Sequence, residues 1–511
     1  MKSKILSILL IACIMFGCNN DTPKVPTNQY VIVLNGNSFN MTQEAYENLV
    51  YFFDYLRKSL SGVENKEDIL NQIERILGDE FKNSSYNDEV IDADELEADI
   101  QTTSNSEEIS NESKLPDING ILRSPLTILA YLVANNNLDN YLYVNVAAMC
   151  QGLSLMDKPA TLFVYWDGKS SVSASTTTTH AILKFETDGK GNVNGQPSMI
   201  ESSDLNQIMS VAEVVKEYPS QLSTSERVMT NVLKDMIAMS STDRFGLIFG
   251  SHGSAWTNSI FTSRSFGQDG PGTDNTIQLP QMVSAMKATG KKFDFLLFDS
   301  CYMGTIEVSY DFKDIADYQI LSVMEVPAYG FPYNTELLPY LYKGTIDGYS
   351  KACAEFVDYY DEVLASGSSS WATVALVDSK EVGNMTAVLK EEIVEHKEAL
   401  SNFDVSDIQE YGKSTAPNIA FDLRHFIKEL NGGEVPAKFD AQLNKTVLYK
   451  DCMETARPSN YGVDKENYCG LGIYIPVSTR KKWNDYFKTI DWYTASGWNE
   501  VTFSWELFPI D

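Results

Sequence analysis

Beyond residue 122, the chain alternates short apolar runs with segments of helical periodicity. The apolar runs have the length of strands and cover residues 127–133, 161–165, 245–249, 293–298, 319–323 and 372–377, and helical patterns lie at 279–290 and 386–400. Runs that are apolar at every position are typical of strands buried on both faces, and their alternation with helices favours a mostly parallel sheet. The pattern predicts one α/β domain over residues 123–511.

The first 122 residues have a different pattern. Apolar positions recur at helical spacing between Met41 and Phe81, which predicts a small N-terminal helical region over 41–84. From Asp88 to Glu112 there are ten acidic residues and no basic one, so residues 85–122 are interpreted as a solvated acidic linker. Residues 18–40 are expected to form a tether.

The extreme N-terminus has the plan of a secretory signal. Lys2 and Lys4 precede an apolar run over residues 5–16, which is too short to cross a bilayer and ends at Gly17-Cys18. We therefore expect a signal peptide over residues 1–17 and export. Gly-Cys at this place resembles a bacterial lipoprotein box, in which Cys18 is lipidated and anchors the protein to the cell envelope, on the periplasmic or surface face of the outer membrane. The alternative is a signal cleaved elsewhere, with Cys18 removed and the protein secreted.

Charge and composition narrow the possible partners. The formal net charge of −30 over 511 residues disfavours nucleic acid and anionic membrane surfaces, because phosphates would be repelled. A lipid at Cys18 would then be the sole membrane attachment. The sequence contains no CxxC and no HxxxH pattern, so we expect no metal and no cofactor. Asp269 and Asp274 offer oxygens for calcium, but without a recognisable ligand spacing.

Two of the predicted strands end in residues that can carry chemistry. The run at 245–249 leads into Ser251-His252-Gly253, and the run at 293–298 leads into Asp299-Ser300-Cys301. If these strands are parallel neighbours joined by the helix at 279–290, both ends lie at one edge of the sheet, where ligands of α/β sheets bind. A thiol beside an imidazole suits acyl transfer: Cys301 attacks a carbonyl, His252 moves the proton, and the backbone N–H of Gly253 approaches the oxyanion.

Each of these residues also has a structural explanation. Buried cysteines are common in protein cores, and a histidine at a strand end is often a satisfied hydrogen-bonding group. Asp299 could cap the turn after its strand. Trp256 could line the cleft or pack beneath it. The pair is more informative than its members, because a histidine about 50 residues before the cysteine is also the spacing of caspases.

The two motifs, together with the flanking sequence, resemble the clostripain family of cysteine peptidases, which belongs to the caspase-like clan. Similarity extends from the strand and Asn-rich tail at 129–142 through the motifs of His252 and Cys301 to GLGIYIP at 470–476, and covers roughly residues 126–508. The resemblance implies a caspase-like α/β/α sandwich and a cysteine endopeptidase that cleaves proteins or peptides. We expect a monomer.

The resemblance also implies residues for substrate binding. Members of the family that cleave after a basic residue, termed P1, use an acid two places before the cysteine, which is Asp299 here. A second acid in the family lies in the loop after the next strand, but that position is Tyr329 in this chain, and Glu325 is shifted in register. A single carboxylate pairs a base less well, so Tyr329 and Phe331 could instead form an apolar pocket. The altered pocket leaves a second hypothesis, a peptidase-like lipoprotein that binds or scaffolds without turnover.

Overall fold

The computed structural model describes residues 30–34, 37–41, 49, 74, 77–78, 126–169, 179–197, 202–257, 266–270, 275–412 and 420–507. The chain divides into two compact units, Met1–Ser124 and Pro125–Asp511. The expected signal peptide, Cys18, the acidic linker and nearly all of the expected helical region lie outside the described residues. Within that helical region, Leu49 and Leu77 are helical and buried.

The first unit contains a β-hairpin inside the segment expected to be a tether. Strand β1 (Tyr30–Leu34) pairs antiparallel with β2 (Asn37–Met41), and Leu34 faces Asn37. Ile32, Leu34 and Phe39 are buried while Val33 is exposed, which is the alternation of a strand with one covered face. The expectation of a tether over residues 18–40 is therefore wrong for residues 30–34 and 37–40, which are strands. Asn35-Gly36 between the strands is the sequence signal for such a hairpin.

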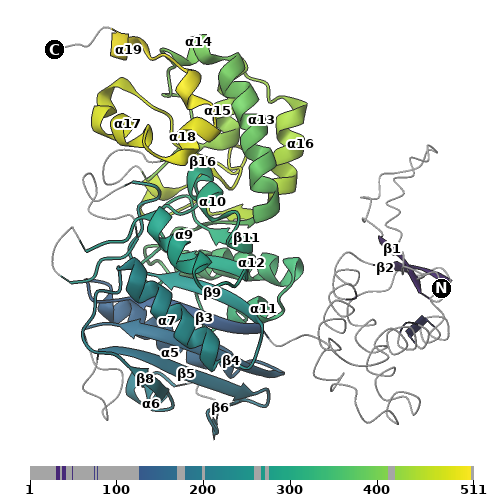
Figure 1. The fold of residues 1–511 in the computed structure, drawn as a ribbon, viewed down its shortest axis with the longest axis vertical. Coiled ribbons are helices and arrows are strands. Elements are labelled where there is room, and N and C mark those ends of the chain that lie inside the picture. Colours follow the sequence, from purple (N-terminus) through teal and green to yellow (C-terminus); the bar gives the residue numbers. More distant parts are fainter. Residues whose placement is uncertain are drawn as a thin grey trace, which may run out of the picture. The chain divides into compact units, whose positions relative to one another are not determined.

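The second unit is built on one large twisted sheet (Figure 1). Within the described residues it has 11 strands, in the order β15-β12-β11-β10-β9-β3-β4-β5-β6-β7, with β8 paired to β5. The strands are β3 (Leu126–Val133), β4 (Pro159–Asp167), β5 (His180–Asp188), β6 (Asn192–Val193), β7 (Gln196–Pro197), β8 (Glu213–Glu217), β9 (Arg244–Gly250), β10 (Phe293–Asp299), β11 (Ala316–Leu321), β12 (Thr373–Asp378) and β15 (Val447–Cys452).

The five central strands, β11 to β4 in that order, are parallel, and strands on both sides of them are antiparallel. This confirms the predicted α/β fold with a mostly parallel core. The run at 372–377 is a strand as predicted, although it runs antiparallel to β11. The run at 319–323 leaves the sheet at Leu321, because the carbonyls of Ser322 and Met324 accept N–H groups from Gly304 and Tyr302 in the loop after β10.

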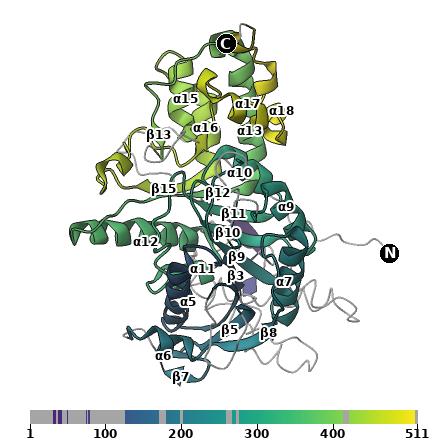
Figure 2. The ribbon, with the colours of Figure 1, turned by 90° about the vertical axis from the view of Figure 1, so that its left-hand side faces the viewer.

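Helices cover both faces of the sheet (Figure 2). Alternate residues of β3 point to opposite sides: Leu129 and Tyr131 join one core, and Ile128 and Ala130 join the other. The first core includes α7 (Glu226–Met239), α9 (Leu279–Lys287), α10 (Ile306–Phe312) and α13 (Val382–Glu395), and the second includes α5 (Asp139–Leu153), α6 (Leu205–Met209), α11 (Leu337–Tyr342) and α12 (Ile346–Ala365). The predicted crossover helix at 279–290 is α9.

A small sheet and further helices complete the unit on the side of α13. The sheet has the order β13-β14-β16, with β13 (Glu410–Tyr411), β14 (Ala420–Asp422) and β16 (Gly472–Ile473). The remaining helices are α14 (Lys397–Leu400), α15 (Leu423–Leu430), α16 (Ala437–Thr446), α17 (Lys481–Phe487), α18 (Asp491–Ala495) and α19 (Ser504–Leu507). Trp256, in the loop after β9, is buried against Tyr474 and Phe487 of this region, so its role is packing.

The packing between β9 and β10 requires a glycine at position 246. A Cβ atom on Gly246 of β9 would lie 2.1 Å from a ring carbon of Phe295 on β10. We expect Gly246→Ala to destabilise the domain by about 1–3 kcal/mol, because the buried ring cannot move without repacking its neighbours. Thermal denaturation followed by circular dichroism measures the effect.

The matched control is Gly383→Ala in α13, where a Cβ atom would meet nothing within 4 Å. This exposed helical alanine should stabilise the domain by about 0.5–1 kcal/mol. Equal melting temperatures for Gly246→Ala and the wild type would contradict the packing argument.

Candidate active site

His252 follows β9 by two residues and is held by its backbone. Ser251 donates its hydroxyl to the carbonyl oxygen of Val133 at 2.7 Å, which ties the end of β9 to the end of β3. The carbonyl of His252 accepts the N–H of Gly267 at 2.9 Å, and Gly253 forms a β-bridge with Phe266. The imidazole is therefore carried on a loop that is anchored on two sides.

The ring of His252 is oriented by an asparagine that the sequence analysis did not single out. Nε2 of His252 lies 2.6 Å from Oδ1 of Asn137, in the turn between β3 and α5. An amide oxygen accepts, so Nε2 carries the proton and Nδ1 is the basic nitrogen. Asn136 fixes this turn, since its Nδ2 donates to the carbonyl of Val133 and its Oδ1 accepts the N–H of Leu138. The Asn-rich run at 135–137 was the available signal.

Cys301 follows β10, the strand next to β9, as the sequence predicted. Asp299 pairs with Gly250 in the parallel register, so both chains leave the sheet at the same edge. The half-buried thiol of Cys301 donates to the carbonyl of Val326 at 3.9 Å. A Cβ atom on Gly253 would lie 2.6 Å from the carbonyl oxygen of Cys301, so the loops of the imidazole and the thiol are in backbone contact. Any larger residue at 253 would force them apart.

Cys301 differs from the other described cysteines in its surroundings. The structure has no disulfide among its five described cysteines, and Cys150, Cys353, Cys452 and Cys469 are buried. Burial raises the pKa of the thiols of Cys150 and Cys452 to about 12, and raises those of Cys353 and Cys469 as well. Among the described cysteines, Cys301 is the one that is partly exposed.

The helix behind Cys301 carries a buried carboxyl group. Glu307 lies on α10, and Thr305 caps that helix by accepting the N–H of Val308. Oε1 of Glu307 accepts the N–H of Tyr474 at 2.8 Å, and burial raises the pKa of this carboxyl to about 7. The contact ties α10 to the strand region of GLGIYIP.

Asp299 is enclosed by hydrogen-bond donors. Its Oδ2 accepts from the hydroxyl of Tyr333 at 3.0 Å, from the N–H of Phe331 at 3.2 Å and from Nδ2 of Asn145 at 3.4 Å. Burial raises the pKa of Asp299 to about 6, and the bonds from Phe331 and Tyr333 oppose this shift. The backbone at residue 330 can lie this close to Asp299 because it is a glycine: a Cβ atom there would lie 2.4 Å from Oδ2 of Asp299.

The other two predicted substrate-binding residues have contacts of their own. Tyr329 is 63% exposed and meets the ring of Tyr141 edge-on at 5.2 Å. Oε1 of Glu325 accepts from the hydroxyl of Tyr461 at 3.3 Å, across 136 residues of sequence. Phe331 is buried and stacks on Phe356, so it belongs to the core and not to an open pocket.

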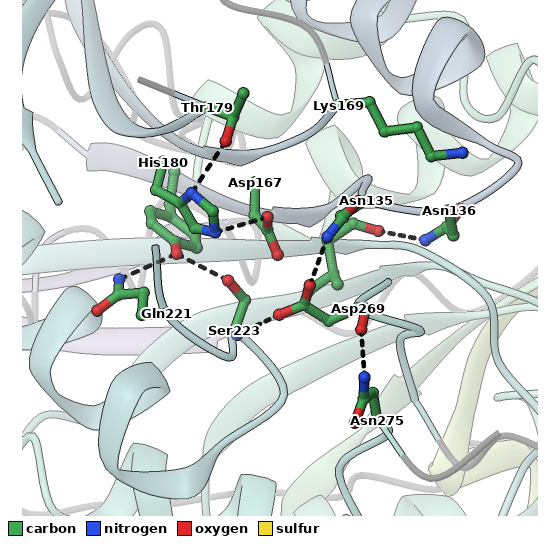
Figure 3. Close-up of polar contacts among 12 residues, drawn as sticks. Asn135, Asn136, Asp167, Lys169, Thr179, His180, Gln221, Ser223, Asp269 and Asn275 are labelled. Atoms are coloured by element: carbon green, nitrogen blue, oxygen red, sulfur yellow. Dashed lines mark hydrogen bonds and ion pairs between the residues drawn. The ribbon is translucent and has the colours of Figure 1, made fainter. Parts of the chain in front are cut away.

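A second polar cluster lies at the same edge of the sheet, beyond β3 (Figure 3). Asp269 accepts from Asn135 at 2.9 Å and from the N–H of Ser223 at 2.6 Å, and Nε2 of His180 lies 3.1 Å from Oδ1 of Asp167. Burial and then Asp269 raise the pKa of Asp167, while burial lowers that of His180, so both neutral forms are favoured. Asp269 shares its loop with Gly267, and the cluster thus anchors the loop that holds His252.

Within the described part of the chain, no group of three or more His, Cys, Asp or Glu side chains is arranged to hold a metal. Asp269, which offered an oxygen for calcium, binds Asn135 and Ser223, and Asp274 lies outside the described residues. None of the described helices is both long and apolar enough to cross a membrane.

Peptidases are among the known proteins that are similar to this chain. The model of the clostripain family matches residues 130–505. A secreted cysteine protease from Bacteroides thetaiotaomicron, solved with an irreversible peptide inhibitor, is 24% identical with a TM-score of 0.58, over 74% of this chain and 100% of that chain. An inactive protease zymogen from Parabacteroides distasonis is 23% identical with a TM-score of 0.57, over 73% and 98%.

The Bacteroides thetaiotaomicron protease named iotapain is 25% identical with a TM-score of 0.55, over 73% of this chain and 99% of that chain. No curated protein sequence gives a significant match. The solved structures share the large central sheet with helices on both sides, and the family model spans most of the second unit. This chain belongs to the clostripain family and is a cysteine-type peptidase.

Proposed function

We propose that this endopeptidase cleaves peptide bonds with Cys301 as nucleophile and His252 as general acid and base. The observation that carries the proposal is the close approach of the two loops. A partly exposed cysteine and an oriented imidazole follow adjacent parallel strands, and a Cβ atom on Gly253 would clash with the carbonyl of Cys301. Such an arrangement brings a nucleophile and a base to one reacting carbonyl.

The reaction proceeds in two steps, acylation and hydrolysis. The thiol of Cys301 gives its proton to Nδ1 of His252, and the sulfur bonds to the carbonyl carbon of the substrate while the N–H of Gly253 faces the oxyanion. The C–N bond then breaks, and His252 protonates the departing amine. A water molecule, deprotonated by His252, attacks the thioester. The C–S bond then breaks to release the carboxylic acid, and His252 returns the proton to the sulfur and restores the thiol.

We also propose export, with lipidation at Cys18. The signal-like N-terminus and the box at Gly17-Cys18 support this, and one similar protein is a secreted protease. The peptide inhibitor bound to that relative supports a peptide or protein substrate for this chain. We expect the protein to act as a monomer without a metal or other cofactor.

The proposed dyad predicts the reactivity of the thiol. Iodoacetamide should alkylate Cys301 rapidly at neutral pH, and His252→Ala should slow this by about tenfold or more, because the thiolate loses its imidazolium partner. Mass spectrometry of the labelled peptide measures the rate, with Cys301→Ala as the blank. Equal rates in wild type and His252→Ala would favour the binding or scaffold protein over the enzyme.

Asn137 acts as a positioning residue in this proposal. Asn137→Ala should lower kcat by about 10²-fold with little change in KM, since the ring of His252 loses its orientation but the substrate loses no contact. Asn137→Asp keeps an oxygen acceptor, so it should recover part of kcat and move the acidic limb of the pH profile upward, because a carboxylate stabilises the imidazolium.

The control for Asn137 is the exposed Asn499→Ala, at which all parameters should stay unchanged. A loss of melting temperature that parallels the loss of kcat in Asn137→Ala would assign Asn137 a purely structural role.

Asp299 is proposed to bind a basic P1 side chain, and its raised pKa of about 6 makes that preference pH-dependent. The carboxyl is neutral below this value and ionised above it, so only the higher pH provides a partner for lysine. The ratio of kcat/KM for P1 lysine over P1 norleucine should fall about tenfold from pH 7.5 to pH 5. Ionisation of Cys301 and His252 affects kcat/KM for both substrates equally, so it cancels in the ratio.

Asp299→Asn should give a low ratio at every pH in the same assay, because Asn cannot ionise but still accepts from Tyr333. A higher kcat/KM for norleucine than for lysine at every pH would instead assign the P1 contact to Tyr329.

A further inference from the structure

A half-buried aromatic surface lies on the side of Cys301 away from His252. We call it the aromatic shelf and define it as Tyr302, Trp371 and Tyr461, which all pack on one cluster of buried residues that includes Val323 and Met324. Trp371 and Tyr461 stack at 4.4 Å with their rings 26° apart. The shelf adjoins the nucleophile directly, because Tyr302 is the next residue after Cys301.

Glu325 places a carboxylate on this shelf. Its backbone carbonyl accepts from Nε1 of Trp371 at 2.9 Å, and its Oε1 accepts from the hydroxyl of Tyr461 at 3.3 Å. The next residue, Val326, has its carbonyl 3.9 Å from the sulfur of Cys301. One acid and two stacked rings therefore meet at Glu325, next to the residue whose carbonyl contacts the thiol. An acid beside aromatic rings is the chemistry that holds a cationic side chain through ionic and cation–π attraction.

Glu325 and Asp299 contact different clusters of buried residues. The partners of Asp299 are Asn145 on α5 and Tyr333, both in the core on the side of α5 and α12. The shelf packs on a separate cluster with Tyr411 and Tyr468. Glu325 therefore does not replace the missing second acid beside Asp299.

The order of strands gives the direction of the substrate. Along the edge of the sheet the order is β12-β11-β10-β9, with Trp371 just before β12, Cys301 after β10 and His252 after β9 (Figure 2). His252 protonates the departing amine, so the residue after the cleaved bond lies on the side of β9. The residue that precedes P1, termed P2, then lies toward β11 and β12. Side chains of an extended peptide alternate in direction, so P1 beside Asp299 turns P2 away from it and toward the shelf.

We propose that Glu325 and the aromatic shelf form a second specificity subsite, which binds a lysine or arginine side chain at P2. This proposal rests on the proposed function, because it takes Cys301 as the point of cleavage. It implies that the enzyme selects substrates with a basic residue before the P1 position, and that Trp371 and Tyr461 contribute to the specificity although they lie 70 and 160 residues beyond the nucleophile in the sequence.

The test measures binding without turnover. Two fluorescent peptides that differ at P2, with lysine or norleucine, are titrated by anisotropy into the full chain carrying Cys301→Ala. We expect the lysine peptide to bind about tenfold more tightly. Glu325→Gln in this background should reduce the difference to about twofold or less, since glutamine can still accept from Tyr461 but carries no charge. Trp371→Leu should reduce it as well.

The matched control is Glu466→Gln, an exposed acid on the segment of Tyr461, which should leave the tenfold difference unchanged. Equal binding of the two peptides, or a lysine preference that survives Glu325→Gln, would overturn the subsite. The same ratio is measured as kcat/KM in the protein with Cys301 intact.

The two proposals fail in different ways. Cleavage that depends on Cys301 but ignores the P2 residue would overturn the subsite and leave the dyad standing. If the protein neither cleaves nor binds any of the peptides, both proposals are overturned. A lysine preference at P3 or after the cleaved bond would refute the direction assigned to the substrate.

Discussion

The parallel pairing of β9 with β10 is the constraint on which the site depends. It brings two chain segments out of the sheet side by side, 49 residues apart in sequence, and a glycine at 253 lets their backbones touch. Neither chemical group is rigid by itself, since each sits on a loop. Their geometry is instead inherited from a buried ladder of backbone hydrogen bonds, which is among the stiffest parts of an α/β protein.

Support for this ladder comes from both sides. On the β3 side, Asn137 and the polar cluster around Asp269 hold the loop of His252, and on the β11 side the carbonyls of residues 322 and 324 hold the loop of Cys301. Buried polar groups are costly unless paired, so these bonds are specific and directional rather than generic packing. The strands β11, β10, β9 and β3 thus hold the two loops of the site together. The flanking antiparallel strands extend the sheet, and the proposed subsite at Trp371 lies just before one of them, β12.

The sequence predicted the central strands, the crossover helix and the placement of His252 and Cys301 after neighbouring strands, because fully apolar runs and the residues that end them are local signals. It did not predict the β1–β2 hairpin, although Asn35-Gly36 is a common hairpin signal. It also did not predict the antiparallel direction of β12, because a run of apolar residues does not encode strand direction. Asn137 was missed because its role depends on a contact across 115 residues. Glu325 and Tyr329 are close in sequence, yet the turn at Gly330 and the aromatic shelf send them to different surroundings, which no periodicity reveals.

Burial of the four other described cysteines has a consequence for redox chemistry. Oxidants attack thiolates, and thiols whose pKa is raised by burial are almost entirely protonated and out of reach of solvent. Damage by peroxide is therefore directed to Cys301 among them. Enclosure would therefore protect the four core thiols in an oxidising compartment, and Cys301 would be the first of the described cysteines to be oxidised.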